Sequence, residues 1–307
     1  MRLRSITTDD RFEVADLIHA SVNAWYQLRG LPRIFNGDPS LTTIFQDVYH
    51  AISPGCAMIA QSDTTGRIMG VCFYHPRQTH VGLGIMSVHP NYFRQGVGRA
   101  LLQAVIDYAD SNGYPSIRLT QSALNLDSFS LYNTAGFVPR CAYQDQFISV
   151  PAQGLNVQIP GIDRVRDARL EDIPSLTALE LELSGVSRAE DYRFCIENPL
   201  GFMSLSVFEN PAGEIDGFLG SSAHPASNLL GPGVCRTDEI AIALIGRELD
   251  RHRGRSPVFL VPVDRPGLVR QMYAWGAKNC ELHFCQVRGA FEPFKGINLP
   301  TFVLETA

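Results

Sequence analysis

One stretch, from Val81 to Asp110, constrains what this chain can fold into more than any other part of it. It begins with a mostly apolar run of about eight residues that stops at His89-Pro90, which is the pattern of a buried strand. Residues 94–98 then read R-Q-G-V-G, and apolar residues recur at helical spacing as far as Asp110. The stretch therefore predicts a strand, a glycine-rich turn and a helix in direct succession.

A turn of this kind can bind a phosphate group. Two glycines separated by one residue let consecutive backbone N–H groups converge on one point. The helix that follows adds four unpaired N–H groups and the positive end of its dipole. We therefore expect the turn to bind phosphate mainly through its backbone. The expected contacts come from Arg94, Gln95, Gly96, Val97, Gly98 and Arg99.

The residues present argue against two other phosphate-binding turns. A P-loop requires a lysine after its last glycine, whereas Arg99 follows Gly98. A Rossmann turn requires a third glycine, and Leu101 stands at that position. A tight turn without any ligand stays open as an interpretation, because glycine pairs are common in turns.

A second motif follows a further predicted strand at residues 117–120. Residues 125–137 read N-L-D-S-F-S-L-Y-N-T-A-G-F. Asn125 can hydrogen-bond an amide-bearing ligand, Tyr132 carries a phenol, and Gly136 can end a helix in a left-handed conformation. The motif is weak by itself, but its place after the glycine turn and one more strand makes the pair specific.

Together the two motifs resemble those of the GCN5-related N-acetyltransferases (GNAT). The family signature, [QR]-x-x-G-x-[GA], binds the pyrophosphate of acetyl-CoA between the fourth strand and the third helix. Here Phe93 occupies the first signature position and Arg94 follows it, so the resemblance assigns binding to the backbone. It implies acetyl-CoA, or another short acyl-CoA, as the cofactor. Beyond the turn, the residues implied in binding it are Ser87, Val88, Asn125 and Ser128.

The resemblance also implies an N-acetyltransferase that acts by direct transfer to a small-molecule or peptide amine in a ternary complex. A backbone N–H near Val88 would polarise the thioester carbonyl, and Tyr132 would protonate the departing thiolate. The proton acceptor for the amine stays open, because the only glutamate in the first 160 residues is Glu13. The remaining candidates are Asp127, which could act through water, and three histidines near strand ends, His75, His80 and His89. An amine that binds in its neutral form would need no base.

The rest of residues 1–152 fits the same fold. Helices are predicted at 11–26 and 41–52, a hairpin at 56–75, and a last strand at 138–150 that would complete the sheet. In the family the two helices and their loop form one wall of the acceptor site. The aromatic residues there are therefore candidate substrate-binding residues, although such residues are more often core. They are Trp25, Tyr26, Phe35 and Tyr49.

The pattern then repeats. Residues 153–161 are predicted to be a linker, residues 162–292 a second GNAT-like domain, and residues 293–307 a C-terminal tail. Where the second domain should carry the glycine turn, residues 231–236 read G-P-G-V-C-R, and Met272 aligns with Tyr132. We therefore expect an α/β fold with α+β-type mixed sheets, in two tandem domains of which the second is degenerate and binds no cofactor.

Composition limits the remaining functional classes. The net charge of −5 disfavours nucleic-acid binding, and residues 161–307 supply all of it with 15 basic against 20 acidic residues. No apolar run reaches the length of a membrane span, and seven cysteines without a CxxC pair argue against a disulfide framework, so a cytoplasmic protein without metal is expected. It would act as a monomer or homodimer. An acyl-CoA sensor, or a dedicated biosynthetic acyltransferase of the mycothiol-synthase type, is the alternative.

Overall fold

The computed structural model describes residues 1–304 of the chain. The elements of the first half follow the predicted order, with the glycine turn between β4 and α3. Its strands are β1 (Arg2–Ser5), β2 (Ala57–Gln61), β3 (Ile68–Pro76), β4 (Val81–Val88), β5 (Ser116–Ser122) and β6 (Val138–Phe147). Its helices are α1 (Arg11–Gln27), α2 (Thr43–Ile52), α3 (Val97–Ser111) and α4 (Leu126–Thr134).

The second half repeats this order. Its strands are β7 (Val165–Asp167), β8 (Met203–Glu209), β9 (Ile215–His224), β10 (Ser227–Cys235), β11 (Val258–Pro262), β12 (Lys278–Gly289) and β13 (Ile297–Leu299). Its helices are α5 (Ile173–Ser184), α6 (Ala189–Glu197), α7 (Asp238–Arg251) and α8 (Pro266–Ala274). Among residues 1–304, no helix is both long enough and apolar enough to cross a membrane.

Residues 231–235, which stand where the sequence placed the degenerate counterpart of the glycine turn, do not lie between a strand and a helix. They lie inside β10, where the pairing with β9 shifts register between Leu230 and Gly233, and Gly231 has a positive φ. Strand β10 then leads into α7 through Arg236 and Thr237 alone. Glycine and proline at these positions therefore mark an irregularity within a strand and not its end. That the second half binds no cofactor stays a prediction.

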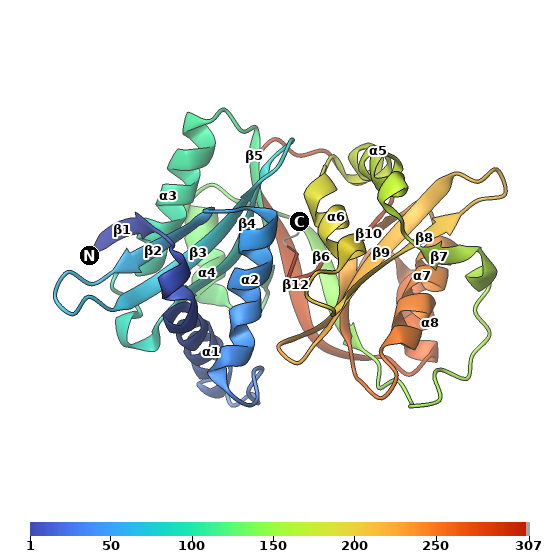
Figure 1. Cartoon of the computed structure of the whole chain (residues 1–307), viewed down its shortest axis with the longest axis horizontal. Coiled ribbons are helices and arrows are strands. Elements are labelled where there is room, and N and C mark those ends of the chain that lie inside the picture. The colour runs from blue at the N-terminus through green and yellow to red at the C-terminus, as the bar shows by residue number, and fades with distance from the viewer. Residues whose placement is uncertain (305–307) are drawn as a thin grey trace.

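The two halves exchange their long last strands. The sheet runs β1-β2-β3-β4-β5-β12-β6-β11-β10-β9-β8-β7, so β12 of the second half lies between β5 and β6 of the first. Strand β12 pairs with β5, with His283 opposite Ser122, and β6 pairs with β11, with Leu260 opposite Asp145. Figure 1 shows β6 and β12 between the two halves. The prediction that 138–150 completes the first half's own sheet is therefore wrong.

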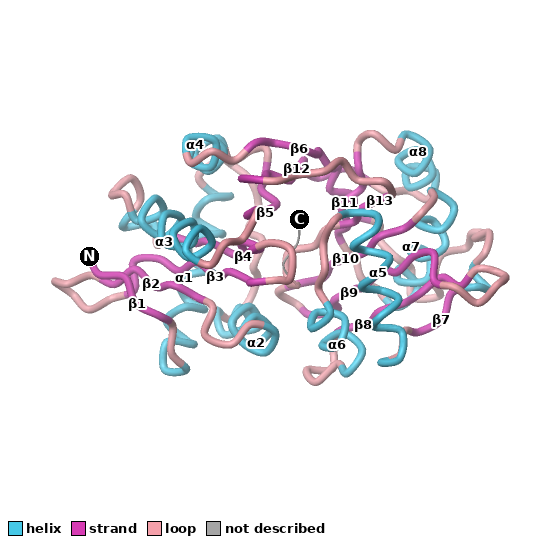
Figure 2. Tube along the Cα trace, turned by 90° about the horizontal axis from the view of Figure 1, so that it is seen from above, coloured by secondary structure: helices cyan, strands magenta, loops and turns pink. Residues whose placement is uncertain are grey.

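Helices cover both faces of this sheet. Seen from above, α2 and α6 lie on one side, and α4 and α8 lie on the other (Figure 2). One hydrophobic core joins α1 and α2 to α5 and α6 across the two halves, whereas α3 with α4, and α7 with α8, pack in separate cores. On the side of α2 and α6, the two halves therefore share one continuous hydrophobic core.

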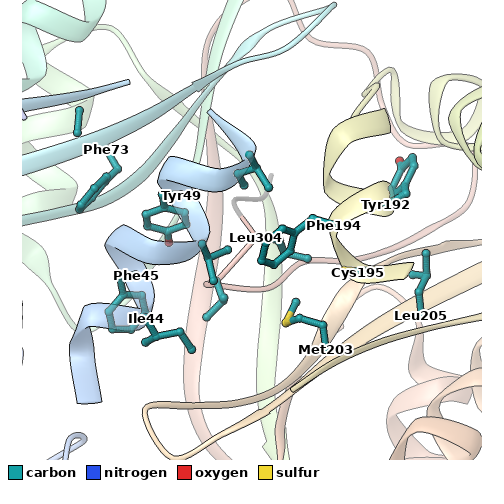
Figure 3. Packing of buried hydrophobic residues seen from close by; sticks show 14 of the residues in the cluster. Ile44, Phe45, Tyr49, Phe73, Tyr192, Phe194, Cys195, Met203, Leu205 and Leu304 are labelled. Carbon is teal, nitrogen blue, oxygen red and sulfur yellow. The ribbon is translucent and has the colours of Figure 1, made fainter. Parts of the chain in front are cut away.

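The C-terminal segment is part of that core. We predicted residues 293–307 to be a tail, but β13 pairs with β10, and Val303 and Leu304 are buried. Leu304 lies between Tyr49 on α2 and Phe194 on α6 (Figure 3). The Tyr49 hydroxyl donates a hydrogen bond of 2.7 Å to the carbonyl oxygen of Phe302. The described part of the segment thus ties the two halves together, and residues 305–307 lie outside the described residues.

Buried ion pairs reinforce the same contact. The Arg77 guanidinium lies 2.7 Å from the Asp191 carboxylate on α6, and both side chains are almost fully buried. The same guanidinium donates to Ser53 Oγ at the end of α2, at 2.9 Å. Arg188 pairs with Glu180 nearby, and both of these are buried too. A charge taken out of water in this way depends on its partner, so the pair of Arg77 with Asp191, which joins the two halves, fixes how they meet.

Candidate active site

The glycine turn has the backbone conformation that an anion site requires. Arg94 and Gly96 both have left-handed dihedral angles, with φ of 60° and 79°. Alternation of left-handed residues with ordinary ones turns successive N–H groups toward one side of the chain. Gly96 is the N-cap of α3, and the N–H groups of its first turn have no partner within the helix. Backbone donors and the helix dipole therefore favour a negative charge at this point.

A large cavity adjoins the turn. It has a volume of about 980 Å³ and lies between the end of α1, the ends of β4 and β5, and α4. Of the residues predicted to bind the cofactor, all except Gln95 line it, and these are Ser87, Val88, Arg94, Gly96, Val97, Gly98, Arg99, Asn125 and Ser128. The Gln95 side chain instead donates to the carbonyl oxygen of Asn91. Neither Arg94 nor Arg99 forms an ion pair with any residue of the described chain, which leaves both cations available to an anionic ligand.

Gly98 leaves the space beside the turn free of side-chain atoms. A Cβ atom at this position would lie 3.6 Å from Leu131 Cδ2 and 3.7 Å from Val88 Cγ2, which is ordinary van der Waals contact. A methyl group would therefore fit, while any longer side chain would have to extend into the cavity. The residues present thus suit the pyrophosphate of a coenzyme A ester.

A second, smaller cavity lies where β4 and β5 separate. The two strands pair only through Val81 with Ile117 and Gly82 with Arg118, and beyond that point they diverge. The gap holds a cavity of about 230 Å³ that is lined by both strands. A register shift in the pairing of β3 with β4 marks a bulge in β4 beside this cavity, which leaves backbone groups of β4 outside the ladder. These groups are available to a ligand in the gap.

The two cavities are neighbours with a common wall. The residues that line both are Val22, Met86, Ser87, Asn125 and Ser128. The Asn125 side chain caps α4 by accepting a hydrogen bond of 3.1 Å from the Ser128 N–H, so α4 holds two of these wall residues in place. A long ligand bound at the turn can therefore extend into the gap between β4 and β5.

Tyr132 lines the smaller cavity from α4. Burial, with a smaller contribution from the nearby Cys72, raises the pKa of its phenol well above the ordinary value. Tyr132 is therefore a neutral phenol across the neutral range, with its hydroxyl hydrogen available as a hydrogen-bond donor in the cavity.

The structure brings only some of the other predicted residues to the site. Trp25, Tyr26 and Asp127 line the large cavity, and Tyr49 lines the small one. Phe35 lines neither cavity, because its ring packs against Phe45 in the core. The remaining catalytic candidate, His80, is also misplaced. It is fully buried before the first residue of β4, at the opposite end of that strand from Ser87, and it lines neither cavity.

The sequence reasoning missed a cluster of polar residues beside the large cavity. Glu281 on β12 accepts hydrogen bonds from Tyr26 Oη, at 2.7 Å, and from Ser122 Oγ. Next to it, His283 Nδ1 lies 2.9 Å from an Asp145 carboxylate oxygen. Atoms of Asp145, Glu281 and His283 lie within 4.8 Å of one another, and these hydrogen bonds within the protein already account for them. The sequence places the site in the first half, whereas Glu281 and His283 come from the second.

Comparison with known proteins identifies the first half. Residues 22–137 match the acetyltransferase (GNAT) family. Over 52 residues the chain is 40% identical to the [ribosomal protein bS18]-alanine N-acetyltransferase of Escherichia coli strain K12, a match that covers 17% of this chain and 35% of that protein. The chain spans about a third of the length of the curated relatives it matches.

Solved structures show the fold of the whole chain. A putative acetyltransferase from Pyrococcus horikoshii is similar with a TM-score of 0.74 at 15% identity, covering 100% of this chain and 95% of that one. A tandem GNAT protein from the clavulanic acid biosynthesis pathway is similar with a TM-score of 0.61 at 14% identity, covering 95% and 99%. The fold is therefore α/β with a mixed sheet, in two tandem GNAT-like domains.

Proposed function

Because residues 22–137 match the acetyltransferase (GNAT) family, we propose that this chain transfers an acetyl group from acetyl-CoA to a primary amine. One observation carries the proposal: the anion-binding turn opens onto a cavity whose wall continues into the gap between β4 and β5, where Tyr132 lies. A long ligand with a phosphate group at one end and a reactive group at the other fits this arrangement. When bound, acetyl-CoA supplies an activated thioester.

The residues of the chain have distinct parts in this proposal. The backbone of residues 94–99 binds the pyrophosphate, and the bulged end of β4 offers an N–H group to the thioester carbonyl oxygen. Tyr132 holds a proton at its phenol oxygen and gives it to the sulfur atom as that atom leaves. The amine would enter from the side of α1 and α2, where Trp25 and Tyr49 line the two cavities.

The acceptor class follows from the site only in part. We propose a small molecule or a peptide N-terminus. The match to a protein described as an alanine N-acetyltransferase supports including the second. The test measures acetyl-CoA binding by calorimetry and CoA release with amines, amino acids, aminoglycosides and a peptide that begins with alanine. Binding with release for at least one class is expected. Binding without release for any amine would favour an acyl-CoA sensor, and no binding would overturn the proposal.

Replacing Tyr132 by phenylalanine is expected to lower kcat by about a hundredfold at neutral pH, because general acid catalysis contributes about 10²–10⁴-fold. The loss should shrink as the pH rises past about 8.5, the ordinary pKa of a thiol, since a thiolate then leaves without a proton. Steady-state CoA release across the pH range measures both effects. Tyr108→Phe, which removes a phenol on α3 away from both cavities, is the control. A Tyr132→Phe enzyme with wild-type kcat at neutral pH would remove Tyr132 from this part.

A further inference from the structure

The exchanged strand β12 brings a carboxylate from the second half to the candidate active site of the first. Ser122, at the end of β5, and Tyr26, at the end of α1, both line the large cavity. Both donate their hydroxyl hydrogens to Glu281, Tyr26 to Oε2 at 2.7 Å and Ser122 to Oε1. The carboxylate therefore lies behind two hydroxyl groups that face the ligand space.

Glu281 carries a charge that its surroundings do not neutralise. Among residues 1–304, no lysine or arginine forms an ion pair with it, and it is not fully buried. The nearest cation, when protonated, is His283, which is already bound to Asp145. A half-exposed carboxylate without a counter-ion beside a cavity favours a positive charge there.

The titratable groups that surround Glu281 hold their protons or are paired. Burial, together with Glu281 itself, raises the pKa of Tyr26 on α1. Burial and the charges of Asp145 and Glu281 raise the pKa of Cys280 to about 12. Burial also raises the pKa of Asp145 on β6, which the nearby Glu281 reinforces and its partner His283 opposes. At neutral pH, therefore, Tyr26 and Cys280 are neutral, and Glu281 is the carboxylate that accepts the hydrogen bonds of the two cavity hydroxyl groups.

Among the candidate bases of the first half, only Asp127 lines a cavity, and the described structure shows no hydroxyl group that donates a hydrogen bond to it. The single glutamate of the first half, Glu13, accepts a hydrogen bond of 3.1 Å from the backbone N–H of Ile68 and lines neither cavity. His80 is buried away from the site, and Asp127 is exposed on the first turn of α4. The strand exchange thus places the Glu281 carboxylate of the second half behind the cavity of the first half.

We propose that Glu281 accepts the proton that the acceptor amine must lose, with the Ser122 hydroxyl as the relay between the amine and the carboxylate. This inference rests on the proposed function. The amine's N–H proton passes to Ser122 Oγ while the Ser122 proton passes to Glu281 Oε1. The acceptor class is then an amine that is protonated, and so cationic, at neutral pH.

The proton balance of the whole transfer is complete. An ammonium group becomes an amide by losing two protons, while the C–N bond forms and the C–S bond breaks. One proton goes through Ser122 to Glu281 and from there to solvent, since Glu281 is only part-buried. The nitrogen gives its second proton to solvent as the amide forms. Solvent returns one proton to the Tyr132 phenolate after the thiol has left, so the transfer releases one proton in all. No oxidant, reductant or further reactant is needed.

The test replaces Glu281 by glutamine, which keeps the shape of the side chain and removes its basicity. With an amine that the wild-type protein acetylates, kcat/KM is measured from about pH 6 to about pH 10, the range below the ordinary pKa of an alkyl amine. At neutral pH we expect a loss of about a hundredfold, in the range of general base catalysis. The loss should shrink steadily toward high pH, where solvent supplies the neutral amine. Affinity for acetyl-CoA, measured by calorimetry, should not change.

Two further variants sharpen the result. Glu292→Gln changes an exposed glutamate just after β12 and should leave the pH profile as it is in the wild type. Ser122→Ala removes the relay without touching Glu281 and should reproduce the pH-dependent loss, which keeps the test valid if Glu281→Gln does not fold.

Three outcomes would overturn the inference, and they are distinguishable. A wild-type profile in both Glu281→Gln and Ser122→Ala would show that neither residue moves the proton. An equal loss at every pH would show that Glu281 only supports the structure. If the wild-type protein itself acetylates no amine, the proposed function fails, and this inference fails with it.

Discussion

Replacing Gly98 by glutamate is expected to weaken acetyl-CoA binding by more than about a hundredfold. The Cβ atom would fit, at 3.6 Å from Leu131 and 3.7 Å from Val88, but the carboxylate would extend into the cavity beside the first turn of α3. It would occupy the anion site and repel the pyrophosphate. Two lost hydrogen bonds to a charged group, at about 1.5–3 kcal/mol each, already account for a loss of this size.

Calorimetric titration with acetyl-CoA measures this effect directly. Gly98→Ala is the matched control, because a methyl group meets only ordinary contacts and alanine favours the helix by about 1 kcal/mol over glycine. We expect it to bind within a few-fold of the wild type and to melt at the same or a higher temperature. Wild-type affinity in a folded Gly98→Glu protein would mean that the phosphate lies elsewhere.

Replacing Asp191 by alanine is expected to lower the free energy of unfolding by about 3–5 kcal/mol. The change would leave the Arg77 guanidinium buried between the halves without its anion, and an unpaired buried charge costs about this much. Urea unfolding measures it. The control is Glu190→Ala on the same helix, since Glu190 is exposed and forms only a surface ion pair at 3.7 Å with Arg193. That change should stay within about 0.5 kcal/mol of the wild type.

A double replacement shows how much of the lost stability comes from the unpaired charge and how much from lost packing. If Arg77→Met is added to Asp191→Leu, no charge is left unpaired, and most of the lost stability should return. The prediction fails if Asp191→Ala unfolds at the same urea concentration as Glu190→Ala. It would then follow that water reaches Arg77 more freely than its exposed fraction of 6% indicates.

The elements of the first half and its glycine turn could be predicted because their signals are local. The glycines at 96 and 98 are explained by the backbone of the turn in which they lie. Apolar periodicity placed α3 and β4 close to their observed bounds. The residues that approach from a distance could not be predicted in this way. Tyr49 was placed by family analogy, whereas its hydrogen bond to the carbonyl of Phe302 joins residues 253 positions apart.

The local sequence of a strand also does not predict which other strand it pairs with. Strands β6 and β12 are the last long strands of their halves, and nothing in either sequence says which of β5 and β11 each will pair with. Which strands pair depends on the contact between the two halves. The position of Glu281 follows from the pairing of β12 with β5, so the local sequence does not predict it. The short helix α6, which spans nine residues, was missed too.

The strand exchange has a consequence for how the protein is made. During synthesis, the edge of β5 that β12 later covers remains open until the chain has grown by the 156 residues between Ser122 and Lys278 (278 − 122). At about 5–20 residues per second, the first half waits for roughly 8–30 s with an unpaired strand edge beside its active site. Such an edge invites pairing with another chain, so the nascent protein is most exposed to aggregation in this interval. The sheet of the first half is therefore complete only when the second half is nearly complete.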